Sequence, residues 1–546
     1  MSPNPVAGTL PETLEAAAED GGFGLAFHLD DGVERLSAKE LLRRSTAGAA
    51  ALARLGVQPG DAVGLIGPNE PAWAAWAYAV WQAAAVLVPL PFPQRIVDHD
   101  AVAWQVASLV RASDCRIVLA HPRFFPLVPP EAGVRWELAA PDEGGQPFPP
   151  GPGSDSVAVV QFTSGSTSAP KGAVLTHRAI LACLDALKPS YGIRPGEDRY
   201  LGWLPFFHDN GLFGYLVRPI VHGCEGHVVP TERFARDPAL WLRHIGETGA
   251  TITSGPSSAW AVALRAAARA PEGIDLSGLR LAVMAAETIQ PGVVDRLVGE
   301  GGRLGLSGAS VAGAYGLAEN TLSVSMTPPG EGLRIDEVDL ASLAGGAAIP
   351  AGEGPAKRVA SCGVPIRDVE VRVVRDGADL RERQVGEVLV RSPSLMTGYM
   401  EWEGPDPFQD GWLLTGDLGY VAGGELFITG RVKDLIIALG RNYAPEDLEW
   451  AAARVSGVRL GRCVAFSLPD AEGEVVLVVE AKEGVDAAAI PRQVHRAVSD
   501  AVGLAPRQVL VVDPGTIGKT TSGKLRRGSI RDRYLQGEIT PIASLR

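Results

Sequence analysis

Short apolar runs rich in β-branched residues alternate with helical patterns over about the first four hundred residues. This alternation predicts α/β layers built on largely parallel sheets. No repeat with a period of roughly 20–50 residues is visible, so a solenoid is not expected. The predicted strands are Asp61–Ile66, Cys115–Ala120, Val157–Phe162, Ala250–Ser254 and Leu279–Ala285, and the predicted helices are Ala38–Leu55, Ala101–Ala112, Arg178–Ala186, Pro238–Glu247 and Pro291–Val298.

The pattern changes near Gly430, where shorter mixed elements begin. Helices and strands of similar length follow one another to the end of the chain, which predicts a compact α+β domain of about 115 residues. A chain of 546 residues is long enough for several domains. The elements expected here are the helix Pro445–Val455, the strands Cys463–Leu468 and Glu474–Ala481, a helix near Arg492–Val502 and the strand Gln508–Val512.

Composition excludes several classes of protein. Hydrophobic residues make up 46% and charged residues 21%, which is typical of a globular protein rather than a disordered or fibrous one. The net charge of −13 argues against a nucleic-acid binder. The 5 cysteines are scattered, so neither a disulfide framework nor a zinc site is expected. The first residues turn acidic at once and form no basic and apolar signal segment, so we expect a cytoplasmic protein.

One stretch could imitate a membrane span. No charged residue occurs from Pro71 to Gln94, which is long enough to cross a bilayer. Because the stretch is rich in alanine and tryptophan and ends among prolines, we favour a buried helix from Ala72 to about Ala85 and a buried strand Val86–Leu90. Two further segments, Ala140–Ser156 and Thr327–Pro355, are rich in glycine, proline and acidic residues and are predicted to be loops.

The strongest local signal is the segment QFTSGSTSAPKG at residues 161–172. It follows a predicted strand and precedes a second apolar run, Ala173–Leu175. Its hydroxyls, its glycines and Lys171 are the groups needed to hold a polyphosphate. It differs from the G-x-x-x-x-G-K-[ST] loop and leads into a strand rather than a helix. The alternative is a flexible Ser/Gly linker, which does not account for the strands on both sides.

A second segment, Gly518–Leu525, nearly fits the nucleotide-loop pattern. Leu525 stands where a Ser or Thr would hold Mg²⁺, and only 22 residues follow Lys524, so no βαβ unit can form around it. A loop that presents Lys524 is the more economical interpretation. The chain has 8 lysines against 42 arginines, and a compact ammonium suits contact with one developing charge on a phosphate. Half of the lysines, Lys171, Lys433, Lys519 and Lys524, fall in turn-like segments, for which chance is the alternative.

Five motifs occur in order along nearly the whole chain. They are TSGSTSAPKG (163–172), YGLAE (315–319), TGD (415–417), GRVKD (430–434) and TTSGKLRR (520–527). Each alone would be weak, but the set resembles the adenylate-forming superfamily of acyl-CoA synthetases, luciferases and peptide-synthetase adenylation domains. The resemblance implies a large N-terminal domain of stacked α/β subdomains (residues 1–430), a hinge (431–433) and a small mobile α+β C-terminal domain (434–546).

The resemblance also implies a site for ATP. Tyr315 would stack on adenine, for which a core tyrosine is the alternative. Asp417 would accept hydrogen bonds from both ribose hydroxyls, although an isolated TGD is more often a plain turn. Arg431 would contact ribose or phosphate. The residues implied around the phosphates and the base are Thr163, Ser164, Gly165, Ser166, Thr167, Lys171, Ala286, Glu287, Ala314 and Gly316.

Further roles follow from the same resemblance. Glu319 and Thr167 would bind Mg²⁺, a hard cation that prefers oxygen ligands. Lys524 would bridge the substrate carboxylate and the α-phosphate, and Lys171 would offset phosphate charge, while a carboxylate displaces pyrophosphate from ATP. The small domain would then turn about Lys433 and admit a thiol, which attacks the acyl-AMP.

Two features resemble the fatty acyl-AMP ligase branch. The segment WLPFFHDNGLFG (203–214) is similar to that branch's L-P-x-x-H-D-x-G-L, where His208 would orient the α-phosphate and close the acyl pocket; a core histidine is the alternative. Glu319 and Gly363 are 44 residues apart, and the residues at about 325–360 are similar to the insertion that hinders use of CoA in that branch. A fatty acid, ATP, Mg²⁺ and a holo acyl carrier protein are therefore the expected reaction partners.

The expected acyl pocket departs from the branch pattern. Asn210 stands where the branch usually has methionine, and in the segment GPSSAW Ser257 and Ser258 replace Asn and Phe while Trp260 replaces Tyr. The lost phenylalanine opens volume that Trp260 is expected to fill, so the length and shape of the acid stay open. The residues implied at this pocket are His208, Asp209, Gly211, Gly255, Ser258 and Trp260.

Two other functions stay open from the sequence. One is an acyl-CoA synthetase whose long loop does not block CoA. The other is a non-catalytic protein that binds ATP or acyl-AMP, against which the presence of Lys524, Glu319, Asp417 and the phosphate loop argues. Neither a nucleic-acid partner nor a membrane span is expected.

Overall fold

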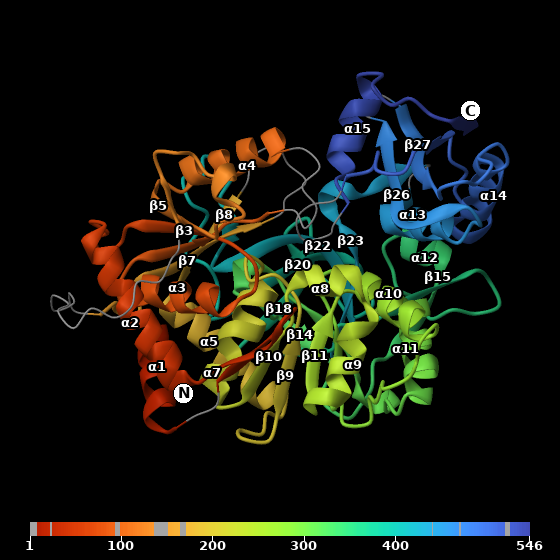
Figure 1. Cartoon of the computed structure of the whole chain (residues 1–546). Coiled ribbons are helices and arrows are strands. Elements are labelled where there is room, and N and C mark those ends of the chain that lie inside the picture. The colour runs from red at the N-terminus through yellow and green to blue at the C-terminus, as the bar shows by residue number, and fades with distance from the viewer. Residues whose placement is uncertain are drawn as a thin grey trace.

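The computed structural model describes residues 8–21, 24–92, 99–135, 151–163, 171–438, 441–468, 471–518 and 525–545, with main chain only at residues 101, 135, 163 and 471–473. A large α/β domain occupies most of the chain and a small α+β domain follows it, which confirms the predicted fold class (Figure 1). In Figure 1 the small domain lies over one side of the large one, above α12.

A six-stranded sheet forms the first layer of the large domain. Its strands pair in parallel as far as β7, and the last pair, β7 with β8, is antiparallel. The segment between β7 and β8 is the expected phosphate loop, so the predicted strand on each of its sides is confirmed. In spatial order the strands are β6 (Gly133–Arg135), β5 (Cys115–Ala120), β3 (Ala62–Ile66), β4 (Val86–Pro89), β7 (Val157–Thr163) and β8 (Lys171–Thr176).

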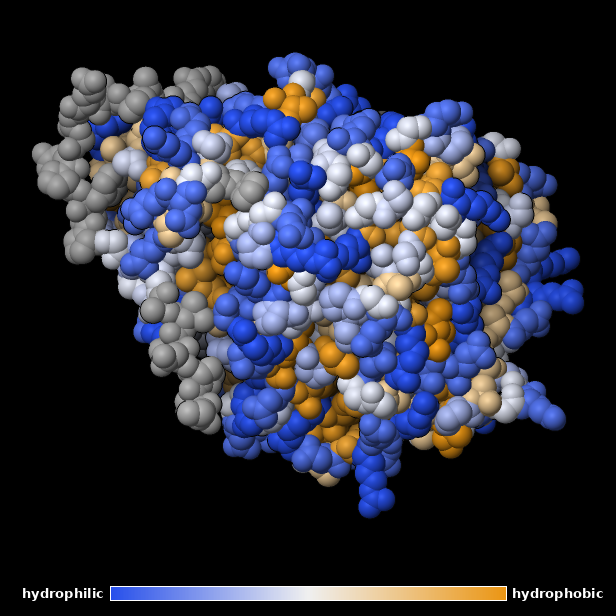
Figure 2. Space-filling view, turned by 90° about the horizontal axis from the view of Figure 1, so that it is seen from below, coloured by the Kyte–Doolittle hydropathy of each residue, from blue (hydrophilic) through white to orange (hydrophobic). Residues whose placement is uncertain are grey.

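The uncharged stretch forms a buried helix and a central strand, as predicted. Helix α3 (Pro71–Gln82) is buried almost all round, with Trp73, Trp76 and Trp81 in the core, so it has no exposed face that needs charged residues. Within the described part of the chain, no helix combines the length and the apolar character needed to cross a membrane. On the face seen in Figure 2, apolar residues lie in separate small groups among polar ones.

A nine-stranded sheet forms the second layer. Its central strands pair in parallel, and helices α9, α10 and α11 lie along it in Figure 1. In spatial order the strands are β17 (Val364–Pro365), β14 (Ser325–Met326), β13 (Val311–Tyr315), β12 (Leu281–Met284), β11 (Ile252–Gly255), β9 (Arg199–Gly202), β10 (Glu225–Val228), β1 (Leu25–Leu29) and β2 (Gly32–Leu36).

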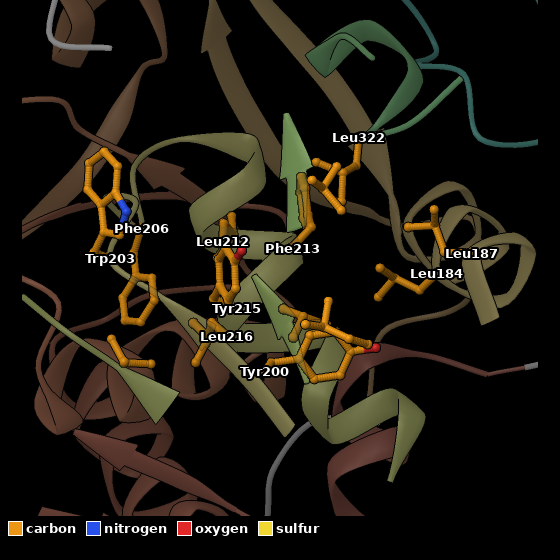
Figure 3. Packing of buried hydrophobic residues seen from close by; sticks show 14 of the residues in the cluster. Leu184, Leu187, Tyr200, Trp203, Phe206, Leu212, Phe213, Tyr215, Leu216 and Leu322 are labelled. Atoms are coloured by element: carbon orange, nitrogen blue, oxygen red, sulfur yellow. The ribbon is translucent and has the colours of Figure 1, made fainter. Parts of the chain in front are cut away.

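The helices of the large domain confirm the predicted set, with ends that differ by up to five residues. Between β9 and β10 the chain passes through a π-helical segment, η2 (Leu212–Val217), whose Leu212, Phe213, Tyr215 and Leu216 lie in the core (Figure 3). The helices are α1 (Leu10–Glu19), α2 (Ala38–Arg54), α3, α4 (His99–Ala112), α5 (His177–Ser190), α6 (Asp209–Gly211), α7 (Arg218–His222), α8 (Thr231–Arg236), α9 (Ala239–Thr248), α10 (Ser257–Ala267) and α11 (Pro291–Arg303).

A third, antiparallel sheet leads to the small domain. Strand β22 (Trp412–Ala422) pairs with β23 (Glu425–Arg431), which ends where the hinge is expected. A short 3₁₀ helix, η5 (Val432–Asp434), follows directly. The other strands of this sheet are β18 (Glu370–Arg375), β19 (Ala378–Asp379), β20 (Gly386–Arg391) and β21 (Phe408–Gln409).

The segment predicted as a loop at 327–355 contains regular structure, which corrects that prediction. Strand β15 (Ile335–Asp339) pairs antiparallel with β16 (Ala356–Ala360), and the short helix α12 (Leu340–Ala344) begins after Asp339, whose side chain accepts from the Ser342 amide. Val338 is buried against Tyr420 and Phe427 of the third sheet. This tertiary burial overrides the loop-like composition. Of the other predicted loop, residues 140–150 lie outside the described residues.

The small domain packs a four-stranded sheet against three helices, with cores of its own. Strands β26 and β27 are longer than predicted, β28 matches its prediction, and β27 and β28 are parallel. The elements are β24 (Ile436–Ala438), β25 (Arg441–Tyr443), α13 (Pro445–Ala453), β26 (Val458–Leu468), β27 (Ala471–Ala481), α14 (Ile490–Val502), β28 (Gln508–Val512), α15 (Arg527–Leu535) and β29 (Ala543–Leu545).

Candidate active site

A cavity of about 1540 Å³ lies where the two domains meet. The large domain supplies residues from the carboxyl ends of its central parallel strands, and the small domain supplies residues of α13 and of the start of α15. Open α/β sheets bind ligands at this edge. The cavity wall includes predicted site residues from four of the five motifs: Lys171, Tyr315, Gly316, Glu319, Asp417, Arg431 and Lys433.

Asp417 is buried and lies at the centre of a polar triad. The Tyr315 hydroxyl donates to its Oδ2 at 2.7 Å, and Nε of Arg431 donates to its Oδ1 at 2.7 Å. The pairing of β22 with β23 places Asp417 opposite Arg431, and β13 delivers Tyr315 at its carboxyl end. Burial and the neighbouring Asp417 carboxylate raise the pKa of Tyr315 well above its ordinary value, so its hydroxyl keeps the proton that it donates.

Glu319 and Lys171 are held by one short segment. The Tyr399 hydroxyl donates to Glu319 Oε1 at 2.7 Å, and Nζ of Lys171 lies 4.9 Å from the centre of the Tyr399 ring and 3.8 Å from that of Trp402. The main chain at residues 397–400 bonds along β8, which carries Lys171. The carboxylate of Glu319 and the ammonium of Lys171 are therefore both positioned at the cavity by the segment that carries Tyr399 and Trp402.

Lys433 joins the cations of this region. Burial lowers its pKa, and the positive charges of Arg431 and Lys171 lower it further. Three cations brought together in this way are suited to a polyanion. Within the part of the chain that the structure describes, no group of three or more His, Cys, Asp or Glu side chains is arranged to hold a metal, so Glu319 would share an ion with ligand oxygens.

The comparisons with known proteins agree with this geometry. The profile of the family described as "AMP-binding enzyme" matches residues 15–400. The chain belongs to this family. Relatives of this AMP-binding enzyme include a protein named as a ligase, Rv1013 of Mycobacterium tuberculosis, 36% identical over 505 residues and covering 90% of this chain and 93% of the relative. The long-chain-fatty-acid–AMP ligase FadD28 of the same species is 31% identical over 582 residues, covering 98% and 99%.

A solved structure from a study of fatty acyl-adenylate ligases from E. coli and L. pneumophila aligns with a TM-score of 0.88. It is 28% identical and covers 97% of this chain and 98% of that one. The predicted recognition of the adenylate-forming superfamily is therefore confirmed, as is the likeness of this AMP-binding enzyme to the fatty acyl-AMP ligase branch.

The wall expected to border the base has a tight backbone. Ala286 has a positive φ of 70°, and the next residue, Glu287, accepts from the Ser258 amide at 2.6 Å and from the Ser258 hydroxyl at 3.2 Å. A Cβ at Gly316 would lie 1.8 Å from the Leu322 carbonyl oxygen, so only glycine fits there. Together with Ala314, these residues line the cavity, and Ser258 joins the base side to the expected acyl side.

His208 starts the segment that forms the acyl side of the cavity. Its Nδ1 lies 2.7 Å from Oδ1 of Asp209, and the same oxygen accepts from the Asn210 amide at 2.6 Å. The Asn210 side chain donates to Ser254 Oγ at 3.1 Å. His208, Asp209 and Asn210 line the cavity, whereas Gly211 is packed against the Pro205 carbonyl and does not.

Trp260 and Gly255 stand behind the cavity wall, contrary to the expectation that Trp260 fills the pocket. Trp260 is fully buried, its ring centre lies 4.2 Å from that of Trp241 at a tilt of 45°, and it donates to the Val283 carbonyl at 3.3 Å. Two residues along a helix are separated by about 200°, so once Ser258 of α10 faces the cavity, Trp260 faces the core. The volume opened by the missing phenylalanine is thus not filled by this tryptophan.

Part of the predicted site lies outside the described residues. This holds for Ser164, Gly165, Ser166, Thr167 and Lys524, and for the side chain of Thr163. On the two sides of Lys524 the chain is anchored. The Ile517 amide donates to Glu480 Oε1 at 2.8 Å, and Arg527 donates to both Glu449 oxygens at 2.6 and 2.9 Å.

Sequence reasoning missed three residues at the cavity. Arg527 also donates to Asp434 of η5 at 3.3 Å, which ties the expected hinge to the small domain. Lys357 of β16 donates to Asp447 of α13 at 2.6 Å, across the two domains. The third is Arg218, which is buried on the cavity wall. Arg527 is the last residue of the TTSGKLRR motif and could have been noticed there, whereas Lys357 and Arg218 lie in none of the five motifs.

Proposed function

We propose that this AMP-binding enzyme activates a carboxylic acid of the fatty class with ATP and transfers the acyl group to the phosphopantetheine thiol of a holo acyl carrier protein. The observation that carries the proposal is the buried Asp417, bonded by Tyr315 and Arg431 in the cavity that also holds Lys171, Glu319 and His208. The fatty class follows from the names of FadD28 and of the fatty acyl-adenylate ligase study.

In this proposal ATP lies along the edges of β13, β22 and β8. Tyr315, Ala314, Gly316 and the Ala286–Glu287 turn border the adenine, and Asp417 accepts from the ribose hydroxyls. The segment from Thr163 to Thr167, with Lys171, surrounds the β- and γ-phosphates, and Arg431 contacts ribose or phosphate. Support comes from the shared cavity and from the cluster of three cations.

The first half-reaction is an in-line displacement. A carboxylate oxygen of the acid forms a bond to the α-phosphorus, the bond from that phosphorus to the bridging oxygen breaks, and pyrophosphate leaves with the electron pair. Lys524 would lie between the carboxylate and the α-phosphate, and His208 would orient the α-phosphate. Mg²⁺, held by Glu319 and Thr167, would neutralise phosphate charge when bound. The carboxylate and hydroxyl donors suit that ion.

The second half-reaction needs the thiol to reach the acyl carbonyl. We propose that the domain formed by residues 434–546 turns about residues 431–433, with Lys433 absorbing the backbone change. Lys524 then leaves the cavity, the thiolate attacks the acyl carbonyl, and AMP departs with the acyl–oxygen electron pair. The position of η5 between β23 and the small domain supports a hinge here.

A carrier protein is preferred to CoA because of the insertion. Lys357 of β16 reaches Asp447 of α13 at 2.6 Å, so the inserted strands contact the domain that has to move. In Figure 1 α12 lies next to α13. A contact of this kind would oppose the rotation that opens a path for CoA. The alternative acceptor, CoA itself, remains the second candidate because the same first half-reaction serves both.

One experiment separates these proposals. Purified protein, ATP, Mg²⁺ and a length series of carboxylic acids are followed for pyrophosphate and acyl-AMP, and then either CoA or a holo carrier protein is added. We expect acyl-AMP to persist with CoA and to be consumed by the carrier. Rapid acyl-CoA formation would move the protein to the synthetase branch, and ATP binding without pyrophosphate release would make it a non-catalytic binder.

A further inference from the structure

Arg218 is an unpaired cation on the wall of the cavity. It begins α7, directly after η2, and is 2% exposed. Among the residues that the structure describes, no carboxylate lies within 4 Å of its guanidinium, and its Nε has no hydrogen-bond partner. Arginine stays protonated in proteins. A full positive charge is therefore buried without a counter-charge beside the expected acyl pocket.

Two other shielded arginines among the described residues are paired with carboxylates. Arg280 donates to Asp198 at 2.7 Å, and Arg527 donates to Glu449 at 2.6 Å. Removing a charge from water costs several kcal/mol unless a partner of opposite charge is present. Arg218 differs from these two arginines, and the difference occurs where the chain meets a ligand cavity.

Two tyrosine rings hold the guanidinium in place. Its central carbon lies 4.9 Å from the Tyr191 ring centre and 4.6 Å from that of Tyr200, which is labelled in Figure 3. Such contacts stabilise a cation only in part, and they fix its plane. Tyr200 is itself fixed, because its hydroxyl lies 2.9 Å from Nδ1 of His222. The guanidinium of Arg218 is therefore held in position before any ligand binds.

The wall near Arg218 is more polar than an alkyl chain requires. Asn210 and Ser254 are bonded to each other, and the Tyr215 hydroxyl lies 2.7 Å from Ser254 Oγ. Ser258, where the branch has phenylalanine, faces the same cavity. Buried polar groups that line a pocket fix the orientation of a ligand and reject ligands that leave them unpaired.

We propose that Arg218 binds a second carboxylate on the acid substrate, so that the protein adenylates one end of a dicarboxylic acid and reads the other end through this guanidinium. The inference rests on the proposed function and names its substrate class. A planar guanidinium binds a carboxylate through two parallel hydrogen bonds, which supplies the missing counter-charge and a partner for the buried N–H groups. A simple alkanoic acid would leave the buried cation unpaired.

The test compares matched acids. Pyrophosphate release is measured for straight-chain monocarboxylic acids, for α,ω-diacids of the same lengths and for the monomethyl esters of those diacids. We expect kcat/KM for a diacid of suitable length to exceed that for its monoester and for the monoacid by about a hundredfold or more. Equal values for diacid and monoester, or a preference for the monoacid, would overturn the inference without the need for any variant.

Variants locate the effect. Arg218→Met keeps an apolar stem of similar length and is expected to remove the preference for the diacid, with partial recovery in Arg218→Lys. Arg233→Met is the matched control, because it removes a shielded arginine that bonds the His28 and Leu29 carbonyls and does not line the cavity, and it should leave the ratio unchanged. An unchanged ratio in Arg218→Met would show that Arg218 only packs between its tyrosines. If neither acid class yields acyl-AMP, the proposed function fails as well; if monoacids alone react, only the inference fails.

Discussion

The two domains contribute to the cavity in different ways. The large domain brings its functional groups together within itself, since Tyr315 and Arg431 both bond Asp417, and Tyr399 bonds Glu319. The small domain contributes the segment that carries Lys524, anchored before and after that lysine to Glu480 and Glu449 of its own fold. Under the proposed function, recognition of the nucleotide would thus be a property of one domain, whereas catalysis would depend on how the second domain is placed.

The first prediction tests this division of roles between the two domains. Lys524→Ala should lower acyl-AMP formation from acid and ATP by about 10²–10³-fold, because it removes a positive charge from the site where charge develops. Thiol transfer from supplied acyl-AMP should be unchanged, since the large domain holds that intermediate. Pyrophosphate release and acyl-thioester formation are measured separately. Loss of both steps would show that the two domains do not divide the work in this way.

A matched control is available in the same segment. Lys519 precedes Lys524 by five residues in the same glycine- and threonine-rich stretch. Lys519→Ala removes an equal charge from the small domain, and we expect both half-reactions to proceed at nearly the original rate. Equal losses in the two variants would point to a general effect of charge.

The second prediction concerns the large domain alone. Asp417→Ala should raise the KM for ATP about 10- to 100-fold, the range expected when hydrogen bonds to a charged group are lost. The original protein should use 2′-deoxy-ATP and 3′-deoxy-ATP poorly, and the variant should no longer distinguish them from ATP. Persistent discrimination in the variant would remove Asp417 from the ribose site. Tyr315→Phe serves as a control, because it leaves the carboxylate in place.

The sequence predicted the nucleotide side of the site better than the acyl side. Tyr315 and Asp417 are 102 residues apart, yet each lies in a short motif, and the order of the motifs was enough to place them together. Arg218 lies in no motif. Its meaning depends on Tyr191, the residue after α5, and on Tyr200 of β9, which reach it only in the folded chain.

The errors in the prediction have physical causes. Trp260 was assigned to the pocket by its motif position, but the helical period turns it away from Ser258 and into the core. The residues of β15 read as a loop because their charges obscure the alternation, and the strand exists through its pairing with β16 and the burial of Val338. Strands and helices with strong apolar patterns, such as α3 and β28, were predicted well because a run of apolar residues is enough to indicate that the element is buried.

The third prediction contrasts the two domains in acid. The large domain buries His222 and His28, and burial lowers the pKa of each to about 3, whereas the described part of the small domain holds one histidine, His495. An unfolded histidine takes up a proton below about pH 6.5. The unfolded state therefore binds more protons than the folded one between about pH 6.5 and 3, and the free energy of unfolding of the large domain should fall as the pH falls through this range.

Denaturant titrations at several pH values check this sign. Ten of the 11 tryptophans lie before the small domain, so tryptophan fluorescence reports mainly on the large one. His222→Gln can keep the bonds to Tyr200 and to the Leu184 carbonyl while losing the titration, and it should reduce the pH dependence. His495→Gln should not. A small domain that unfolds first in acid would contradict the contrast.

The smallest expected effect lies at the contact between the domains. Lys357→Ala removes the 2.6 Å bond to Asp447, and because this pair is partly shielded we expect a change of several-fold rather than a loss. If the contact restrains rotation of the small domain, CoA-dependent acyl transfer should rise while pyrophosphate release stays constant. Asp447→Asn should act in the same direction, and the double variant should add little to either, because both substitutions remove the same interaction.

Arg358→Ala, which removes the neighbouring ion pair to Asp295 within the large domain, is the matched control and should leave the choice of acceptor unchanged. An equal rise in that control would assign the effect to the insertion as a whole and not to its bond with the moving domain.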